Sequence, residues 1–178
     1  MKTLYLFGSA APPVLEMAAI VEEGQARGWR VCLGLTPTAM QWVGTQVTEL
    51  ERLTGHPVRS QYKLPGEPDV WPQADAILFA PATFNTVNQW ALGLTSAFVV
   101  GVVAEGIGKG IPIVTMPCVN AAYVQHPQFD RSVDTLRKAG VTVLYGEGGF
   151  VPNQPGERRP EGFPWSLALD AVGGILNG

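Results

Sequence analysis

Two side chains that could take part in chemistry lie two residues apart in the segment MPCVNAAYVQHP, residues 116–127. The thiol of Cys118 is a nucleophile only when it is ionised, and no Lys or His stands close by in the sequence to lower its pKa. A small buried thiol can instead behave as an apolar side chain. The amide of Asn120 is the better candidate, because it can donate a hydrogen bond to a carboxylate without carrying charge. The same residue type also caps helices, and the sequence favours neither role of Asn120 over the other.

Hydroxyl groups follow several of the apolar segments that the sequence predicts as strands, at Ser9, Thr36, Thr38, Thr83 and Thr86. These hydroxyls stand at the ends of three predicted strands, directly before or at the start of a predicted helix. The N-terminus of a helix offers free backbone N–H groups and a partial positive charge, which suit a phosphate group. At any single position an ordinary helix cap is the more common explanation. The repetition of this pattern at several strand ends favours a ligand that carries phosphate.

Other common sites are not supported by the sequence. The first turn, GSAAPP, lacks the G-x-G-x-x-G spacing of dinucleotide-binding proteins. The segment EGIGKG has no Ser or Thr after Lys109 and follows a predicted helix, so we interpret it as a helix end. The two histidines, His56 and His126, are too few and too far apart to predict a metal site. We find no nucleophile elbow for a Ser-His-Asp triad.

The composition restricts the classes of partner. The net charge is -3 and no basic cluster occurs, which argues against binding to nucleic acid or to an anionic membrane. Only 15% of the residues are charged and 46% are hydrophobic, so we expect apolar surface and self-association. The two cysteines do not indicate a disulfide framework, and no apolar run is long enough to span a bilayer. We therefore expect a cytoplasmic protein.

The residues above must be positioned by alternating strands and helices. Apolar segments predict strands at 3–7, 29–35, 57–62, 76–81, 111–117 and 141–145. Helical spacing or turn signals predict helices between them and one more after residue 164. Strands that are apolar throughout and alternate with helices predict a doubly wound α/β fold, with a mostly parallel sheet and helices on both faces. We expect one domain, 1–178, with a Gly/Pro-rich loop at 146–163 that is a flap or disordered.

Two segments resemble a known family. ADAILFAPATFNT, residues 74–86, is similar to the pattern A-D-x-x-x-x-A-P-x-S/T-x-N-T of the flavoprotein family that contains phosphopantothenoylcysteine decarboxylase and the lantibiotic peptide cysteine decarboxylases. The segment that starts at Pro117 resembles the P-A-M-N element of that family. Its matching positions are Pro117, Asn120, Pro127, Arg131 and Gly140. The resemblance covers roughly residues 1–145.

The resemblance implies a Rossmann-like fold that binds FMN and assembles as a homo-oligomer, a trimer or a multiple of trimers. It places the FMN phosphate near Gly8, Ser9, Ala10, Thr36 and Thr38. It assigns the rest of the cofactor site to Pro81, Thr83, Phe84, Asn85, Thr86 and Cys118. It gives Asn120 the role of contacting the carboxylate of a small substrate.

The sequence departs from that family at several positions. The decarboxylases carry a catalytic His eight residues before the Asp that corresponds to Asp75, and this chain has Glu67 there. Val119 replaces the Met of P-A-M-N, Ser96-Ala97-Phe98 replaces a D-N-L element, and the loop 146–163 has no Cys. An ionised carboxylate at position 67 cannot donate a hydrogen bond. We therefore predict a decarboxylase-like flavoprotein that is not an authentic cysteine decarboxylase.

Two alternatives remain at this stage. The chain could be a non-catalytic flavin-binding or regulatory relative, or it could bind a different phosphorylated ligand. In the loop, Arg158 and Arg159 could meet an anionic group of a substrate, since guanidinium pairs well with carboxylate and phosphate. A solvated surface turn explains these two arginines equally well.

Overall fold

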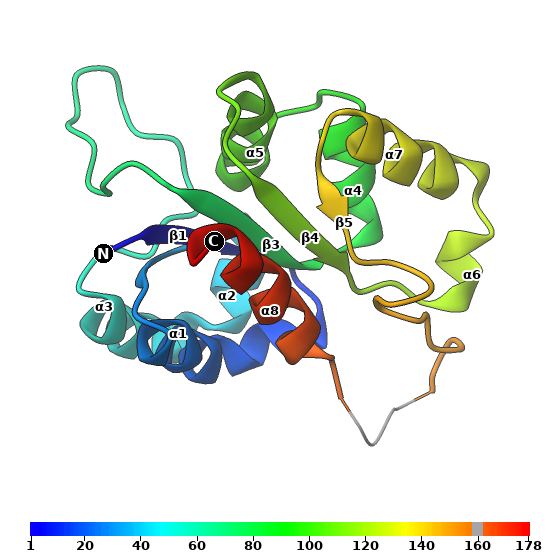
Figure 1. The fold of residues 1–178 in the computed structure, drawn as a ribbon, viewed down its shortest axis with the longest axis horizontal. Helices are drawn as coiled ribbons and strands as arrows, with labels where there is room; N and C mark the ends of the chain where they lie inside the picture. The colour runs from blue at the N-terminus through cyan, green and yellow to red at the C-terminus, as the bar shows by residue number, and fades with distance from the viewer. Residues whose placement is uncertain (158–161) are drawn as a thin grey trace.

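The computed structural model describes residues 1–157 and 162–178, and within them five strands form a parallel sheet in the order β2-β1-β3-β4-β5 (Figure 1). All four strand pairs are parallel. The strands are β1 (Thr3–Gly8), β2 (Arg30–Leu35), β3 (Ala76–Ala82), β4 (Ile113–Pro117) and β5 (Thr142–Val143). The prediction of a doubly wound, parallel sheet is confirmed.

The strands are apolar throughout because both faces of the sheet are covered. All seven residues of β3 are buried, and so are all five of β4. Alternate side chains of each strand enter different clusters: Leu6 and Leu78 belong to one, whereas Phe7 and Phe79 belong to the other. This alternation is the period of two that a pleated strand imposes.

Helices on each side complete these two clusters. The cluster of Leu6 is covered by the 3-10 helix η1 (Pro12–Glu16) and by α1 (Met17–Ala26), α2 (Pro37–Trp42), α3 (Val47–Thr54) and α8 (Trp165–Leu176). The cluster of Phe7 is covered by α4 (Phe84–Ala91), α5 (Phe98–Gly108) and α7 (Pro127–Lys138). The short helix α6 (Ala121–Val124) joins β4 to α7. Figure 1 shows the two groups on opposite sides of the sheet.

Two predicted elements differ from the structure. The expected strand at 57–62 is reduced to a single parallel bridge between Gly34 and Arg59. Pro57 has no N–H to donate to a ladder, and only Arg59 exchanges backbone hydrogen bonds with β2. The helix expected from residue 37 to residue 50 is interrupted at Val43 and a 3-10 turn, Gly44–Gln46, before α3 begins. Glycine and β-branched residues are weak helix formers, which accounts for the break.

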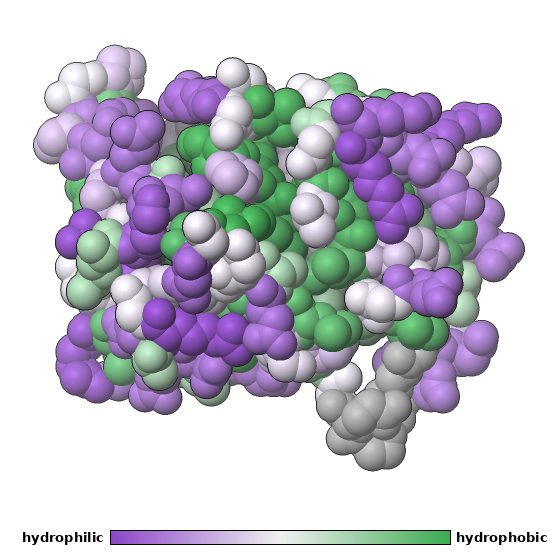
Figure 2. Space-filling model, viewed as in Figure 1, coloured by the Kyte–Doolittle hydropathy of each residue, from purple (hydrophilic) through white to green (hydrophobic). Residues whose placement is uncertain are grey.

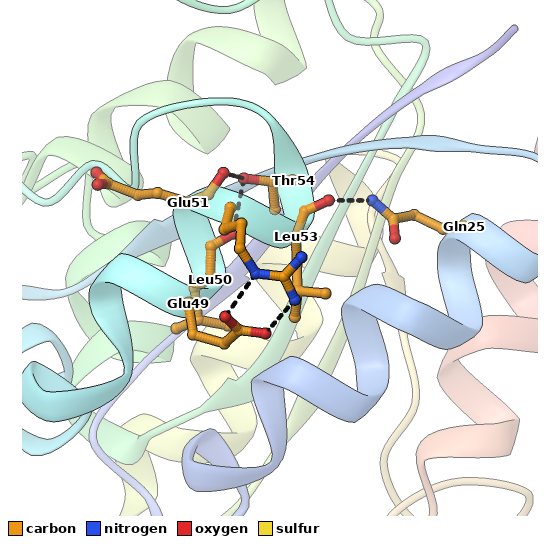
Figure 3. A network of polar contacts seen from close by, with 7 residues as sticks. Gln25, Glu49, Leu50, Glu51, Leu53 and Thr54 are labelled. Carbon is orange, nitrogen blue, oxygen red and sulfur yellow. Dashed lines mark hydrogen bonds and ion pairs between the residues drawn. The ribbon is translucent and has the colours of Figure 1, made fainter.

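Helix α3 is fixed at its end and against α1 (Figure 3). The Thr54 hydroxyl donates to the carbonyl of Leu50 at 2.9 Å, and Gln25 of α1 donates its amide to the carbonyl of Leu53 at 2.6 Å. Gly55 ends the helix with a φ of 67°, which glycine adopts without strain. These contacts hold the connection that begins at the carboxyl end of β2.

Helix α8 brings the last part of the chain back onto the first. It packs on β3 and β4 (Figure 1), the Trp165 indole donates to Glu16 at 2.8 Å, and Arg27 forms an ion pair with Asp170 at 2.8 Å. Figure 2 shows apolar side chains gathered near the middle of this face. Among the described residues, no helix is both long and apolar enough to cross a membrane.

Candidate active site

A cleft with a volume of about 940 Å³ lies at the carboxyl ends of the strands. Its lining includes residues one or two positions after β1, β2, β3 and β4, namely Ala10, Thr36, Thr83 and Cys118. From β1 the chain continues to β2, toward one edge of the sheet, whereas from β3 it continues to β4, toward the opposite edge. In open α/β sheets a ligand site forms at this change of direction, and the volume is in the range of cofactor pockets.

The floor of the cleft is a chain of hydroxyl groups. The hydroxyls of Ser9 and Thr86 lie 2.7 Å apart, and the Thr83 hydroxyl donates to that of Thr86 at 3.1 Å. The backbone N–H of Ser9 also donates to the carbonyl of Pro81 at 2.8 Å. These bonds join the ends of β1 and β3, so the floor is held by both strands at the switch point.

Threonines at two rims of the cleft are helix caps. The Thr36 hydroxyl accepts from the N–H of Ala39, and the Thr83 hydroxyl accepts from the N–H of Thr86 at 3.3 Å. Thr36, Thr38 and Thr83 also line the cleft. The capping interpretation of Thr36 and Thr83 is therefore confirmed, and the same residues face the space where a ligand would bind.

Asn120 is both a helix cap and a cleft residue. Its side-chain oxygen accepts from the N–H groups of Ala122 at 3.1 Å and Tyr123 at 3.0 Å. These two donors fix the orientation of the amide, because they require the oxygen on that side. Among the described residues no hydrogen bond uses the amide nitrogen, so its two N–H donors are left for another partner. The cap therefore prepares Asn120 as a donor.

Cys118 follows β4 and borders the same space. Its N–H donates to the carbonyl of Ala82 at 2.8 Å, and its side chain is partly buried. Burial raises the pKa of the Cys118 thiol to about 11. The thiol is therefore neutral at physiological pH and is not an activated nucleophile. This agrees with the interpretation of Cys118 as an apolar neighbour of the ligand.

Aromatic rings form two parts of the wall. Phe84 and Tyr123 stack with their ring centroids 4.8 Å apart, and both line the cleft. Phe150 and Phe163 also line it, and Phe163 packs edge-on against Trp165 at 4.9 Å. The cleft therefore combines ring faces with a polar floor.

The described lining carries acidic side chains and no Lys, Arg or His. Glu16 accepts a hydrogen bond from the Trp165 indole, and Glu157 accepts from the N–H of Gln154 at 2.8 Å. Both carboxylates thus have partners within the fold. Within residues 1–157 and 162–178, an anion in this cleft would be bound by hydroxyl, amide and backbone N–H donors.

Nine of the twelve predicted site residues line the cleft: Ala10, Thr36, Thr38, Thr83, Phe84, Asn85, Thr86, Cys118 and Asn120. The other three, Gly8, Ser9 and Pro81, are buried and are not part of the lining. A Cβ at Gly8 would come 2.5 Å from the terminal methyl group of Met17 and 3.0 Å from Val14, so these side chains would have to shift. The predicted loop residues Arg158 and Arg159 lie outside the described residues.

A model of the family described as Flavoprotein matches residues 2–159. The chain belongs to the flavoprotein family. Coenzyme A biosynthesis bifunctional protein CoaBC from Thermococcus kodakarensis is 30% identical over 102 residues, which are 53% of this chain. The match spans only 25% of that relative.

Solved structures of low sequence identity share the fold. TvaF, an FMN-dependent cysteine decarboxylase from thioviridamide biosynthesis, matches with a TM-score of 0.72 and 22% identity over 97% of this chain and 98% of its own. A variant of PPC decarboxylase in complex with pantothenoylaminoethenethiol matches with a TM-score of 0.71 and 16% identity over 99% of both chains. AnUbiX, in complex with FMN and dimethylallyl pyrophosphate, matches with a TM-score of 0.66 and 10% identity over 80% of this chain and 76% of its own.

The groups around the cleft of this flavoprotein fit an FMN molecule. Hydroxyl and helix N-terminal N–H groups suit its phosphate, and the aromatic walls suit a flat ring system. Asn153 lines the cleft, and within residues 1–157 and 162–178 its buried side-chain oxygen has no hydrogen-bond partner. A buried acceptor of this kind is costly unless a donor reaches it, as a ligand N–H would on a small movement of the side chain.

Glu67 lies away from this cleft within the flavoprotein chain. It borders a separate hollow of about 440 Å³ with Arg59 and Tyr62, and it accepts from the N–H of Leu64 at 2.8 Å. His126 caps α7 through its Nδ1 atom, and its ring packs edge-on against Phe84 with the centroids 5.6 Å apart. It is not in the cleft lining. Neither residue occupies the cleft of its own chain.

Tyr123 and Asn153 were missed by reasoning from the sequence. Tyr123 is three residues after Asn120, so one turn of helix brings it to the same rim. That spacing could have pointed to it. Asn153 reaches the cleft through a parallel bridge with Asn120 and a 2.7 Å bond from the N–H of Ala121 to its carbonyl. This pairing depends on the path of a loop, and no local sequence pattern predicts it.

Proposed function

We propose that this flavoprotein binds FMN non-covalently in the cleft and acts on a small substrate in a decarboxylase-like reaction. The observation that supports it most is the convergence of capping hydroxyls, at Thr36 and Thr83, with the fixed amide of Asn120 around one cleft at the switch point. The family supports a flavin, and among the proteins that share the fold TvaF is FMN-dependent and AnUbiX is in complex with FMN.

The roles of the residues follow from their donors. Thr36, Thr38 and Thr83, with nearby backbone N–H groups, would hold the phosphate. The free N–H groups of Asn120 would hold a carboxylate of the substrate in a fixed orientation, while Cys118 and Phe84 keep water from that place. Bound FMN would supply two-electron redox chemistry there.

Bound flavin can be tested directly. The purified protein should absorb in the flavin region, and denaturation should release a chromophore with the mass of FMN. Adding FMN to stripped protein should raise the melting temperature, and the rise should grow with the logarithm of the FMN concentration above the dissociation constant. A protein that releases no flavin and shows no thermal shift with FMN would exclude this function and leave a different phosphorylated ligand.

We further infer that the protein does not decarboxylate phosphopantothenoylcysteine or a peptide C-terminal cysteine at an appreciable rate. The described cleft lining holds carboxylates and no imidazole, and Glu67 stands where the family pattern has its His. The absence of a positioned general acid or base typically lowers a rate about a hundred- to ten-thousand-fold. Released carbon dioxide, measured with each thiol substrate and with Glu67→His, tests this. Turnover by the unmodified protein would refute it, and no reaction with any acid would favour a non-catalytic flavin-binding role.

Self-association is part of the same proposal. Helix α5 has Glu105 as its only charged residue, and Val102, Ala104 and Ile107 remain partly exposed. A helix apolar on nearly all sides needs more cover than one sheet face provides. We expect a trimer or a multiple of trimers in light scattering at micromolar concentration, and a monomer would exclude it.

A further inference from the structure

A column of aromatic rings runs from the core to the rim of the cleft. Phe129 is fully buried, and Phe84 stacks on it with centroids 6.1 Å apart and planes 18° apart. Tyr123 also stacks on Phe84, with ring centroids 4.8 Å apart and planes 28° apart. His126 and Tyr145 hold the column from its edges. Because Phe129 is fixed in the core, the packing of the fold sets the orientation of the rings that stack outward from it.

The outer end of this column has no partner of its own. Tyr123 is 53% exposed, and no hydrogen bond to its hydroxyl occurs within residues 1–157 and 162–178. A large exposed ring held by stacking, at the rim of a cleft, presents both an apolar face and a quadrupole to whatever enters. Such a surface favours flat, unsaturated rings over saturated rings of the same volume.

The ring lies next to the anchoring amide. The N–H of Tyr123 itself donates to the side-chain oxygen of Asn120 at 3.0 Å, so one turn of chain carries both the amide donor and the ring. The side chains between the amide and the strand are Val119 and Cys118, which offer no competing charge. A ligand that binds both features has an acid group joined to a flat ring by a short link.

We propose that Tyr123, supported by Phe84, forms a stacking subsite beside Asn120, and that the substrate of the cleft is a carboxylic acid with a planar aromatic ring. This proposal rests on the proposed function in using Asn120 as the carboxylate donor. It goes beyond that function by naming the class of substrate and the residues that select it.

The test uses two probes that differ in the ring alone. 3-Phenylpropionate and 3-cyclohexylpropionate have the same charge and linker, and calorimetry measures the dissociation constant of each with the FMN-loaded protein. An aromatic pair contributes enough beyond buried area to favour the phenyl probe about three- to tenfold. Equal dissociation constants, or tighter binding of the cyclohexyl probe, would overturn the proposal.

Variants assign the preference to the ring. Tyr123→Leu should reduce the preference to less than about twofold, because it keeps apolar volume and removes the π-face. Tyr123→Phe should keep the preference, since the hydroxyl has no role in it. Tyr62→Leu is the matched control, because Tyr62 is 52% exposed and lies outside the cleft lining. A preference that survives in Tyr123→Leu, or that is lost equally in Tyr123→Phe, would overturn the proposal; thermal melts confirm that each variant is folded.

The same titrations separate this inference from the proposed function. If the protein does not bind FMN but still prefers the phenyl probe, the flavin proposal fails and the subsite stands. If FMN binds and neither probe is preferred, the subsite fails alone. If Tyr123→Leu weakens FMN binding tenfold or more without any phenyl preference in the parent protein, the ring packs on the cofactor and the subsite is again refuted.

Discussion

Two tyrosines of nearly equal exposure, Tyr123 at 53% and Tyr62 at 52%, end two different aromatic clusters. The Tyr62 ring packs edge-on against Phe98 at 5.7 Å, and its hydroxyl donates to the carbonyl of Thr95 at 2.7 Å. The guanidinium of Arg59 covers the Phe98 face at 4.0 Å. In the described residues, Tyr123 has one stacked neighbour, no cation over its ring and no partner for its hydroxyl.

The difference separates a structural cluster from a binding surface. Around Tyr62, the hydroxyl is already bonded, the ring has an edge-on neighbour and Arg59 covers the Phe98 face, so the cluster stabilises a connection without regular secondary structure, between α3 and β3. In the column that ends at Tyr123, the inner rings, Phe84 and Phe129, are each in contact with more than one other ring, whereas among the described residues Tyr123 stacks on Phe84 only. Exposure alone therefore does not identify a site; unused interaction capacity beside a cleft does.

The largest expected effect comes from removing the base of the cleft column. Phe129→Ala should lower the free energy of unfolding by about 3–5 kcal/mol, since it deletes a fully buried ring. Tyr123→Ala should cost less than about 1 kcal/mol, as is usual at exposed positions. Urea unfolding measures both. A loss below about 1 kcal/mol in Phe129→Ala would show that the column is not anchored in the core.

In the hydroxyl floor of the cleft the side chains bond to one another, so removing one hydroxyl should lower stability, as in the Tyr62 cluster. Thr86→Val leaves the buried Ser9 hydroxyl without its 2.7 Å partner and should cost about 1–3 kcal/mol in unfolding free energy. Ser9→Ala removes the other end of the same bond. In the double variant the cost should be smaller than the sum of the two, because one interaction is lost in each. Strict additivity would mean that the two hydroxyls act independently.

The comparison can be tested on the hydroxyls themselves. Tyr62→Phe should lower the unfolding free energy by about 0.5–1 kcal/mol, because the bond to Thr95 is lost. Tyr123→Phe should change it by less than about 0.5 kcal/mol. Thermal melts of the two variants at equal concentration provide the measurement. An equal loss in both would place an unseen structural partner on Tyr123.

The smallest effect on stability is expected at Cys118, where pH is the informative variable. With a pKa of about 11, the thiolate is only about one part in a thousand at pH 8, so iodoacetamide should react slowly and about tenfold faster for each unit of pH up to 10. Mass spectrometry after timed labelling follows the adduct, and Cys118→Ser removes it. Cys32 is fully buried with a pKa of about 12 and should remain unlabelled. Fast labelling at pH 7 would restore the nucleophile interpretation.

The parts of the fold and site that the sequence predicts are the ones fixed by local pattern. The strand AILFAP is apolar at every position because both faces of the sheet are covered, and its end is marked by Thr83, a helix cap. The same logic placed Thr36 and Asn120 at the starts of helices. Residues at successive strand ends of a parallel sheet converge on one edge, so their grouping around one cleft could be predicted as well.

What failed depends on contacts between distant segments. The segment 57–62 has strand-like composition, yet Arg59 turns its side chain onto Phe98 and Trp71 and pairs with β2 at one residue only. The stack of Tyr123 on Phe84 joins the ends of β3 and β4, and the bridge of Asn153 to Asn120 comes from a loop. A single sequence gives the residue types at these positions but not the loop paths that bring them together.

The position of α8 has a consequence for synthesis on the ribosome. Val172 and Leu169 complete the cluster that holds Leu6, Leu78 and Met116, and α8 contacts both β3 and β4. Until the segment up to Leu176 has left the ribosome, the growing chain exposes that face of its two central strands. At about 5–20 residues per second, the wait between the end of β4 and the end of α8 lasts several seconds. During this interval α1, α2 and α3 can cover only part of this sheet face, and the apolar part over β3 and β4 that α8 later covers is the kind of surface that chaperones bind.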